Sequence, residues 1–233
     1  MEDPPLIGHG RAADVFDVGG GRVLRRYRIA QSGSVEREAH AMQFLRAHGA
    51  PVPEVFSASG TDIVMERLDG PTMLDVLTSK PWRAAAIGRE LASLQACIHR
   101  IPAGDIELRR FSDGDAILHL DLHPDNVMLT ANGPMIIDWS NVAVGDPLAD
   151  VMYSWMLMCT SSPDHVPLLL RPLLSRVRNA LTDGFIEGTP LDDHARSWIV
   201  RACALRIADA NTHEHERVRV RAFAVAQGSA VRS

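Results

Sequence analysis

Two short apolar runs, 127–129 and 135–137, joined through Asn132-Gly133, constrain this chain more than any other feature. An Asn-Gly pair between two such runs is a strong signal for a tight β-hairpin, because both turn positions favour a left-handed backbone. A third apolar run, 116–118, precedes the hairpin and leads into a polar loop. The sequence therefore predicts that the chain folds back on itself here.

Three oxygen-bearing side chains stand at the ends of these runs. Asp121 lies in the polar loop, Asn126 follows five residues later, and Asp138 ends the second strand of the hairpin. A hairpin places the start of its first strand beside the end of its second, so we expect the three groups to converge. Two carboxylates and an amide oxygen suit a hard cation such as Mg2+, and one carboxylate can stay off the metal to orient a hydroxyl.

This order of parts is the one that phosphoryl transfer on the kinase plan requires: a loop aspartate, an asparagine on the metal, and an aspartate on the metal after the next strand. The segment resembles the catalytic core of the aminoglycoside phosphotransferase and choline kinase-like family. The matching positions are His119, Asp121, His123, Pro124, Asn126, Ile137, Asp138 and Trp139. The chain departs from the family pattern at Leu120, where glycine is usual, and at Asp125, where glycine is common.

The resemblance implies an α+β, two-lobed protein-kinase-like fold. It assigns residues 1–68 to a small antiparallel-sheet lobe with one long helix, which binds nucleotide. It assigns residues 69–233 to a mainly helical lobe with the catalytic loop and the acceptor site. Apolar runs between glycine turns predict strands at 6–7, 13–18, 23–27, 55–58 and 62–65. Apolar residues at three- and four-residue steps, together with the loss of strand signals after Pro71, predict helices. These lie at 34–48, 74–77, 82–101, 151–159, 166–186 and 191–225.

The resemblance also implies a nucleotide site in the first lobe. Gly8 and Gly10 would form a flap whose backbone N–H groups approach phosphate oxygens, since glycine has no Cβ in the way. Arg25 would reach the phosphates in place of the usual lysine, and Glu38 would hold it there. Arg26 is the alternative, but adjacent strand residues face opposite sides and only one of the two arginines can face the site. At the hinge between the lobes, backbone groups of Glu66 and Leu68 would contact adenine.

Several residues are predicted to have structural roles. Ser34 is placed to cap the helix that Gly49 ends. Asp146 can cap the helix that starts at Pro147, and the resemblance implies that Asp146 and Asp150 support the catalytic loop. His119 is interpreted as a residue that props that loop, not as an acid or base.

Composition excludes several classes of protein. The chain has 233 residues, of which 46% are hydrophobic, and a net charge of −5 without a long basic run, which argues against a nucleic-acid partner. Its most apolar stretch, 151–159, is too short to span a membrane, and its first residues lack the pattern of a signal peptide. Cys97, Cys159 and Cys203 are widely spaced and are interpreted as buried thiols of a cytoplasmic protein.

We therefore expect a phosphotransferase that depends on ATP and Mg2+ and acts on a hydroxyl of a small molecule, with Asp121 as base and Asn126 and Asp138 on the metal. One alternative is a nucleotide-binding pseudoenzyme that serves as an interaction module. Another is a metal-dependent hydrolase that uses His119, Asp121 and His123 as ligands. The acceptor stays open among sugars, amino alcohols, nucleosides and antibiotics, and the oligomeric state is not predicted. The acidic residues that could meet a cationic acceptor, although each is more typical of solvated surface, are Asp164, Asp192, Asp193 and Glu214.

Overall fold

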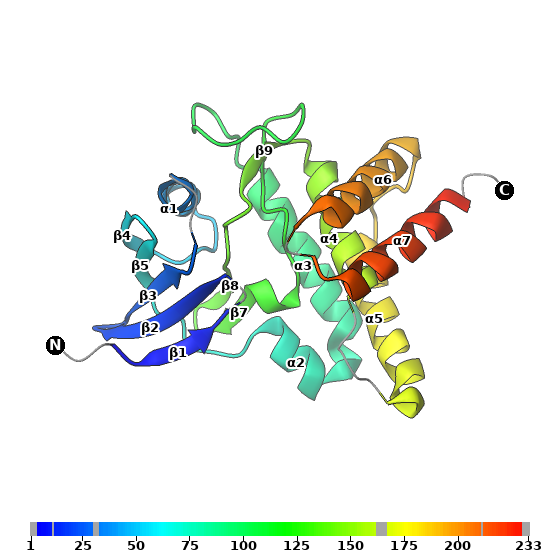
Figure 1. Cartoon of the computed structure of the whole chain (residues 1–233), viewed down its shortest axis with the longest axis horizontal. Helices are drawn as coiled ribbons and strands as arrows, with labels where there is room; N and C mark the ends of the chain where they lie inside the picture. Colours follow the sequence, from blue (N-terminus) through cyan, green and yellow to red (C-terminus); the bar gives the residue numbers. More distant parts are fainter. Residues whose placement is uncertain (1–3, 11, 30–32, 162–166, 211, 230–233) are drawn as a thin grey trace.

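The computed structural model describes residues 4–10, 12–29, 33–161, 167–210 and 212–229. It has a sheet lobe and a helical lobe, which lie side by side in Figure 1. Asp164 lies outside the described residues. The elements of the sheet lobe are β1 (Leu6–His9), β2 (Ala13–Gly19), β3 (Arg22–Tyr27), α1 (Ser34–Ala47), β4 (Val55–Ser59) and β5 (Asp62–Glu66).

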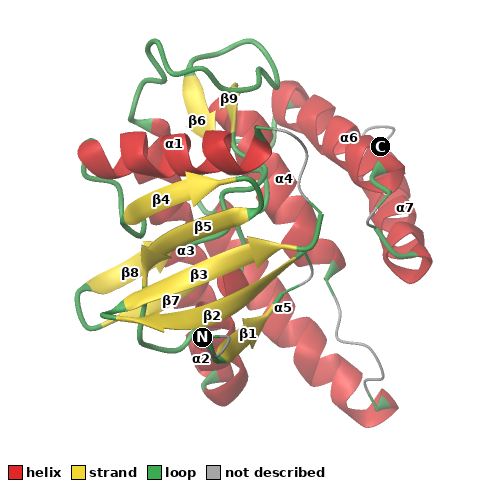
Figure 2. Cartoon of the chain, turned by 60° about the vertical axis from the view of Figure 1, so that its left-hand side comes forward, coloured by secondary structure: helices red, strands yellow, loops and turns green. Residues whose placement is uncertain are grey.

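The five strands form one antiparallel sheet in the order β1-β2-β3-β5-β4, which confirms the strands predicted here. The helix α1 packs along the β4 edge, as Figure 2 shows. Val23 and Ile63, from neighbouring strands, are buried together with Met42 and Leu45 of α1 in the core of this lobe. Burial of these side chains fixes the register, because a shift by one residue would turn each of them to the opposite face.

The helix α1 begins differently from the prediction. Its N-cap residue is Gly33, with φ 73°, and no side chain caps the first turn, so Ser34 is the first helical residue and not the cap. The predicted end is correct. Gly49 has φ 80°, and the N–H of Ala50 donates to the carbonyl of Leu45 at 3.0 Å, which closes the last turn.

The helical lobe contains six α-helices among its described residues, with two small antiparallel ladders between the lobes. The helices are α2 (Met73–Ser79), α3 (Ala84–His99), α4 (Pro147–Thr160), α5 (Arg171–Ile186), α6 (Asp193–Ala208) and α7 (Glu214–Ser229). The ladders pair β6 (Ala116–Leu118) with β9 (Ala143–Gly145) and β7 (Val127–Thr130) with β8 (Gly133–Ile136). The second ladder is the predicted Asn-Gly hairpin. No described helix is long and apolar enough to cross a membrane.

The single helix predicted over 191–225 is wrong, because the chain forms two helices there. The first ends at Ala208, and Asp209 leaves the helical conformation with ψ 123°. Aspartate and threonine are poor helix residues because their short polar side chains bond to nearby backbone, and Asp209 and Thr212 lie in this break. The break lets α7 turn back along α6, and both helices contact α4.

The helices α3 and α5 cross at two glycines. A Cβ added to Gly88 would lie 2.1 Å from the carbonyl oxygen of Leu181, and one added to Gly184 would lie 2.3 Å from that of Ala85. The two backbones therefore touch at this crossing, and no larger residue fits there without moving a helix.

The β7–β8 hairpin is hydrogen-bonded to the chain just before β4 and just after the segment that joins the lobes. The N–H of Ile136 donates to the carbonyl of Pro51 at 2.8 Å, just before β4. The N–H of Leu129 donates to the carbonyl of Pro71 at 2.8 Å, just after the segment that joins the lobes. The hairpin thus lies at the junction of the two lobes and contacts both.

Candidate active site

The loop that follows β6 is held by one buried carboxylate. Asp150 of α4 accepts the N–H of His119 at 3.1 Å and the N–H of Leu120 at 2.7 Å, and His99 lies 2.9 Å from it. Burial raises the pKa of Asp150, but the hydrogen bond and charge of His99 and the backbone donors offset it, so the pKa lies below its usual range. The predicted support by Asp150 is present.

Asp146 does not support the loop, contrary to the prediction. It caps α4 through the N–H of Leu148 at 2.9 Å, as expected. Its other oxygen binds His194 at 2.7 Å and Trp198 at 2.8 Å, both on α6. Asp146 therefore joins α4 to α6, because its carboxylate meets α6, whereas Asp150, one turn further along α4, meets the catalytic loop.

The backbone conformation at Leu120 is one that glycine adopts more easily than other residues, which accounts for the usual glycine at this position. Its φ is 59°, in the left-handed region that costs an ordinary residue about 1–2 kcal/mol. Its side chain is buried in a small cluster with Leu118 and Ala143, which offsets that cost. The departure from the family pattern therefore leaves the loop conformation in place.

His119 has a structural position. Its Nε2 lies 3.0 Å from the carbonyl of Ile137, its Nδ1 accepts the N–H of Asp121 at 3.2 Å, and its ring packs edge-on against Trp139. Both ring nitrogens are used, so His119 cannot also bind a metal beside Asp121. No cluster of three metal-binding side chains occurs among the described residues. The metal-dependent hydrolase that would use this trio is therefore wrong.

Asn126 lies beneath the loop, at the start of the hairpin. Its Nδ2 donates to the carbonyl of Asp121 at 2.8 Å, and its own carbonyl accepts the N–H of Ile137 at 3.0 Å. The first bond fixes the amide so that the side-chain oxygen, Oδ1, remains available to a cation. The second bond ties Asn126 to the residue before Asp138, which brings the two predicted metal ligands together.

Asp138 ends the hairpin in a left-handed conformation, with φ 63°. Its Oδ1 accepts from Arg25 at 2.7 Å and from the hydroxyl of Ser140 at 2.8 Å, and its side chain is 33% exposed. Burial raises the pKa of Asp138, but the charge and hydrogen bond of Arg25 more than offset it. The pKa of Asp138 therefore lies below its usual range and the group is an anion at neutral pH.

Arg25 connects the two lobes. It donates to Glu38 of α1 at 3.0 Å as well as to Asp138, so the predicted pairing of Arg25 with Glu38 is present. Glu38 is only 2% exposed and also accepts from the hydroxyl of Tyr27. Arg26 faces the other side of the sheet, where it binds Asp62 through two hydrogen bonds. Of the two arginines, only Arg25 faces the site.

Among the described residues, no arginine or lysine pairs with Asp121. Nε2 of His123 lies 4.0 Å from Oδ1 of Asp121, and the Asp121 side chain is 25% exposed. Burial raises the pKa of Asp121 above its usual range, against the charges of His123 and His119. Among described residues this group combines a raised pKa with exposure, as a proton acceptor requires.

Sequence reasoning missed Arg206 on α6 and Tyr153 on α4. The charge of Arg206 acts on both Asp121 and Tyr153, and Glu216 of α7 holds the guanidinium. Neither residue lies in a motif, and the break after α6, which brings Glu216 back to Arg206, was not predicted. For Tyr153 the sequence held one usable signal, the apolar pattern of α4, which turns this side chain toward the loop. For Arg206 it held none.

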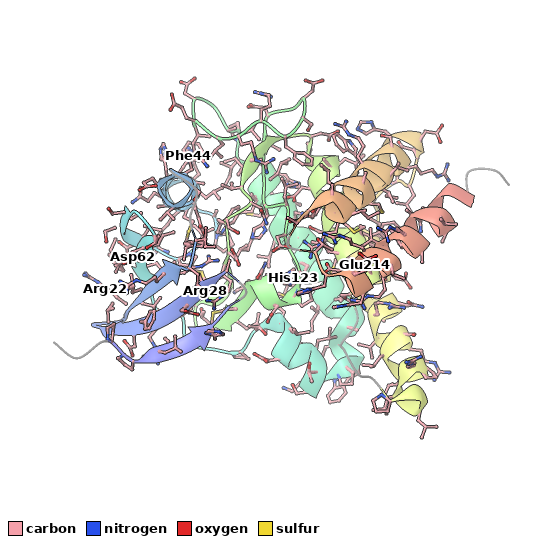
Figure 3. The ribbon with its side chains drawn as sticks, viewed as in Figure 1. Arg22, Arg28, Phe44, Asp62, His123 and Glu214 are labelled. Carbon is pink, nitrogen blue, oxygen red and sulfur yellow. The ribbon has the colours of Figure 1, made fainter. Side chains whose placement is uncertain are left out.

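The remaining predicted residues lie in the sheet lobe. Gly8 lies in β1 at a shift in strand register, and the N–H of Gly10 donates to the carbonyl of Ala13 at 2.9 Å. Figure 1 shows the β1–β2 turn at the end of the sheet nearest the helical lobe. Arg28, which is labelled in Figure 3, donates to the carbonyl of Gly10 there at 2.9 Å. Glu66 ends β5, and Leu68 follows it in the segment between the lobes.

A sheet lobe and a helical lobe, joined by an arginine that reaches a loop of two aspartates and an asparagine, define a protein of the kinase-like class. The comparisons with known proteins place it more closely. The chain belongs to the phosphotransferase enzyme family, whose model matches residues 5–116 and 113–170.

Solved structures share this fold over nearly the whole chain. Aminoglycoside phosphotransferase APH(4)-Ia superposes with a TM-score of 0.66 at 16% identity, covering 97% of this chain and 94% of that one. The amicoumacin kinase hAmiN, in complex with AMP-PNP, Ca2+ and Ami, superposes with a TM-score of 0.59 at 12% identity, covering 97% and 88%. These likenesses confirm the predicted two-lobed α+β fold.

One curated relative has a higher sequence identity than these structures but matches a shorter part of the chain. The EKC/KEOPS complex subunit BUD32 of Encephalitozoon cuniculi (strain GB-M1) is 31% identical over 108 residues, which are 43% of this chain and 54% of that protein. The matched part of the chain spans about half the length of this relative.

Proposed function

We propose that the chain transfers a phosphoryl group from ATP to a hydroxyl of a small molecule, with Mg2+. The supporting observation is the continuous network from Glu38 through Arg25 to Asp138, beside Asp121, which no arginine or lysine pairs among the described residues. The network fixes the Arg25 guanidinium where the phosphates of ATP would lie. It leaves the Asp121 carboxylate for the hydroxyl that receives the phosphoryl group.

Asp121 is the proposed proton acceptor. Its carboxylate would accept a hydrogen bond from the acceptor hydroxyl and align the oxygen for in-line attack on the terminal phosphorus. The proton moves to Asp121 as the new P–O bond forms and the bond to the ADP oxygen breaks. The raised pKa of Asp121 makes it a better proton acceptor than an ordinary carboxylate.

The donor set fits Mg2+. Asp138 offers a carboxylate that is an anion at neutral pH, and Asn126 offers Oδ1 because its Nδ2 is used by Asp121. These two residues would hold the ion, which when bound supplies positive charge to the phosphate oxygens. Arg25 contacts Asp138 at the same place and would share its charge between Glu38, Asp138 and the phosphates.

The nucleotide would lie against the sheet lobe, residues 1–68, and the acceptor against the helical lobe, residues 69–233. The β1–β2 turn with Gly8 and Gly10 would cover the phosphates. The N–H of Gly10 is already bonded to Ala13, so it is not available for that contact. Adenine would meet the backbone between Glu66 and Leu68. Since the Glu66 N–H donates to Glu54, its carbonyl oxygen is the group left for the contact.

A nucleotide-binding interaction module is the second candidate. It is favoured by the sequence likeness to a protein that is a complex subunit and by arginine in place of the usual lysine at position 25. The two candidates predict the same nucleotide binding and differ only in turnover.

Two measurements separate them. Calorimetric titration with ATP, with and without Mg2+, tests binding. Release of ADP is then followed across a panel of sugars, amino alcohols, nucleosides and antibiotics, with Asp121→Asn as the blank. We expect at least one compound to raise ADP release only with Mg2+ and only in the unsubstituted protein. Binding without turnover on any hydroxyl compound would favour the interaction module, and absence of nucleotide binding would refute both.

A further inference from the structure

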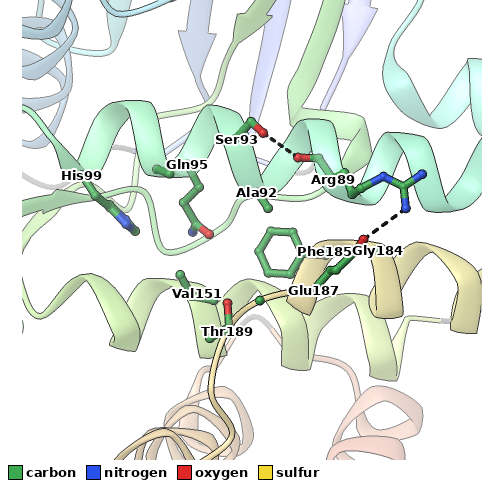
Figure 4. A pocket seen from close by; sticks show the side chains of 12 residues that line it. Arg89, Ala92, Ser93, Gln95, His99, Val151, Gly184, Phe185, Glu187 and Thr189 are labelled. Atoms are coloured by element: carbon green, nitrogen blue, oxygen red, sulfur yellow. Dashed lines mark hydrogen bonds and ion pairs between the residues drawn. The ribbon is translucent and has the colours of Figure 1, made fainter.

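The helical lobe contains a pocket of about 400 Å3 outside the candidate active site. It lies between α3, α4 and the end of α5, as Figure 4 shows. Its walls are Ala92 and Ala96 of α3, Val151 of α4 and Phe185 of α5. This size lies within the range of small-molecule sites, and the lining is mostly apolar.

The pocket is preformed. The α3–α5 crossing at Gly88 and Gly184 holds the two backbones in contact, and Gly184 itself lines the pocket together with the end of α5. A ligand would therefore pack on surfaces that are already present, and only Gln95 Oε1, which has almost no accessible surface, must shift to meet it.

One buried polar group is left for a ligand. Gln95 is 2% exposed and reaches from α3 into the pocket, where its Nε2 donates to the hydroxyl of Ser154 at 3.1 Å and its Oε1 has no partner. Turning the amide over would exchange the two ends and leave the nitrogen unpaired instead. A buried amide oxygen without a partner costs about 1–3 kcal/mol, which a donor on a ligand recovers.

The charged groups at the pocket are already paired. Arg89 and Glu187 bind each other at 3.1 Å at its rim, and His99 binds Asp150 at 2.9 Å. A charged ligand would have to break one of these pairs or enter an apolar site unpaired. The lining therefore selects an uncharged molecule.

We propose that this pocket binds a small uncharged molecule with a hydrogen-bond donor beside an apolar group, and that the catalytic loop senses its presence. The donor meets Gln95 Oε1, and the apolar group packs on Phe185 and Val151. The connection to the loop is short: His99 lines the pocket and holds Asp150, whose other oxygen accepts the N–H of Leu120 at 2.7 Å. A ligand that moves His99 moves Asp150 and the residue before Asp121.

Two probes that differ by one hydroxyl test the binding. Benzyl alcohol and toluene are titrated into the full chain, and the methyl resonances of Ala92 and Val151 are followed by NMR. We expect both to saturate, and Gln95→Leu to weaken benzyl alcohol about tenfold while toluene binding changes little. Equal weakening of both probes, or shifts that never saturate, would overturn the proposal.

The connection to the loop is measured without nucleotide, so its result does not depend on the proposed function. Saturating benzyl alcohol should shift the amide resonance of Leu120. Ala96→Phe, which fills the pocket from an exposed helix position, should abolish that shift and the methyl shifts together while the protein stays folded. Methyl shifts that saturate while the Leu120 amide does not respond would refute the connection.

Discussion

Arg25 Nη2 lies 2.7 Å from Asp138 Oδ1, although the two residues come from different lobes. Arg25 is only 14% exposed and also binds Glu38. Two carboxylates therefore share one guanidinium at the junction of the lobes. The relationship makes Arg25 important for stability as well as for the proposed reaction, and the two effects can be separated.

Arg25→Gln should lower turnover about a hundredfold or more, since it removes a fixed cation from the developing phosphate charge. It should also lower the free energy of unfolding by about 3 kcal/mol, because Glu38 stays buried without its cation. Arg26→Gln is the matched control: its ion pair with Asp62 is exposed, so stability should change by less than about 1 kcal/mol. Steady-state kinetics measures the turnover of both variants, and urea unfolding measures their stability. Equal effects of the two substitutions would contradict the assignment of Arg25.

Substitution of the site carboxylates should lower turnover severely without unfolding the protein. Asp121→Asn removes the proton acceptor and should cost about 10²–10⁴ in turnover. Asp138→Asn keeps a residue that tolerates the left-handed backbone, so its loss of activity reports on the metal and not on the fold. Asp125→Asn, exposed in the same loop, should stay within about twofold, as is typical of surface substitutions. Circular dichroism checks the fold, and retained transfer in Asp121→Asn would exclude Asp121 as base.

The pH dependence of turnover should have an acid limb from Asp121. The carboxylate is the active form, so kcat/KM falls as the pH drops through the pKa of Asp121, which burial raises above the usual value of about 3.9. A raised carboxyl pKa also means that ionised Asp121 lowers stability at neutral pH, so Asp121→Asn should raise the unfolding midpoint at pH 7. An acid limb at or below pH 4, or a midpoint that falls, would argue against this environment.

The sequence alone predicted the hairpin and the convergence of its polar residues because these depend on local turn chemistry and on spacing. Asn132-Gly133 specified the turn, and the turn brought Asn126 next to Asp138. The strand pattern likewise placed Arg25 and Arg26 on opposite faces, while the choice of Arg25 rested on the family resemblance. Such features are readable because neighbours in sequence determine them.

Other features depend on packing between distant segments and could not be predicted. Arg206 acts on Asp121 through its charge because α6 packs on α4, and the break after Ala208 brings Glu216 back to hold its guanidinium. The family resemblance implied that Asp146 supports the loop. Nothing in the local sequence indicates that α6 packs over its carboxylate instead. In the sequence, Gln95 resembles any polar residue of a helix, and only the packing of α4 and α5 shows that it is buried.

Leu120 offers a test of the left-handed backbone. Leu120→Gly and Leu120→Ala both lose the buried side chain, which should cost about 2–5 kcal/mol. At φ 59° glycine avoids the Cβ clash, so Leu120→Gly should be more stable than Leu120→Ala by about 1 kcal/mol, the reverse of their order in a helix. Thermal unfolding of the two variants gives the difference. If the alanine variant were the more stable, Leu120 would not have this conformation.

The α3–α5 crossing predicts opposite effects for two Gly→Ala substitutions. Gly88→Ala places a Cβ 2.1 Å from the carbonyl of Leu181 and should lower the free energy of unfolding by about 2 kcal/mol or more. Gly228→Ala lies in α7 with no atom within 4 Å of the new Cβ, so it should raise stability by up to about 1 kcal/mol. Urea unfolding of both variants measures the contrast, and a neutral Gly88→Ala would mean that the helices do not touch there.

The bond between Ile136 and Pro51 sets where the two lobes can separate. Pro51 lies next to β4, one edge of the sheet, and β1 forms the opposite edge. Because the catalytic hairpin is attached at the β4 edge, rotation of the sheet lobe about that attachment moves the β1 edge farthest. In the proposed reaction, nucleotide would then enter and product would leave beneath the β1–β2 turn, while the attachment at Pro51 would stay closed.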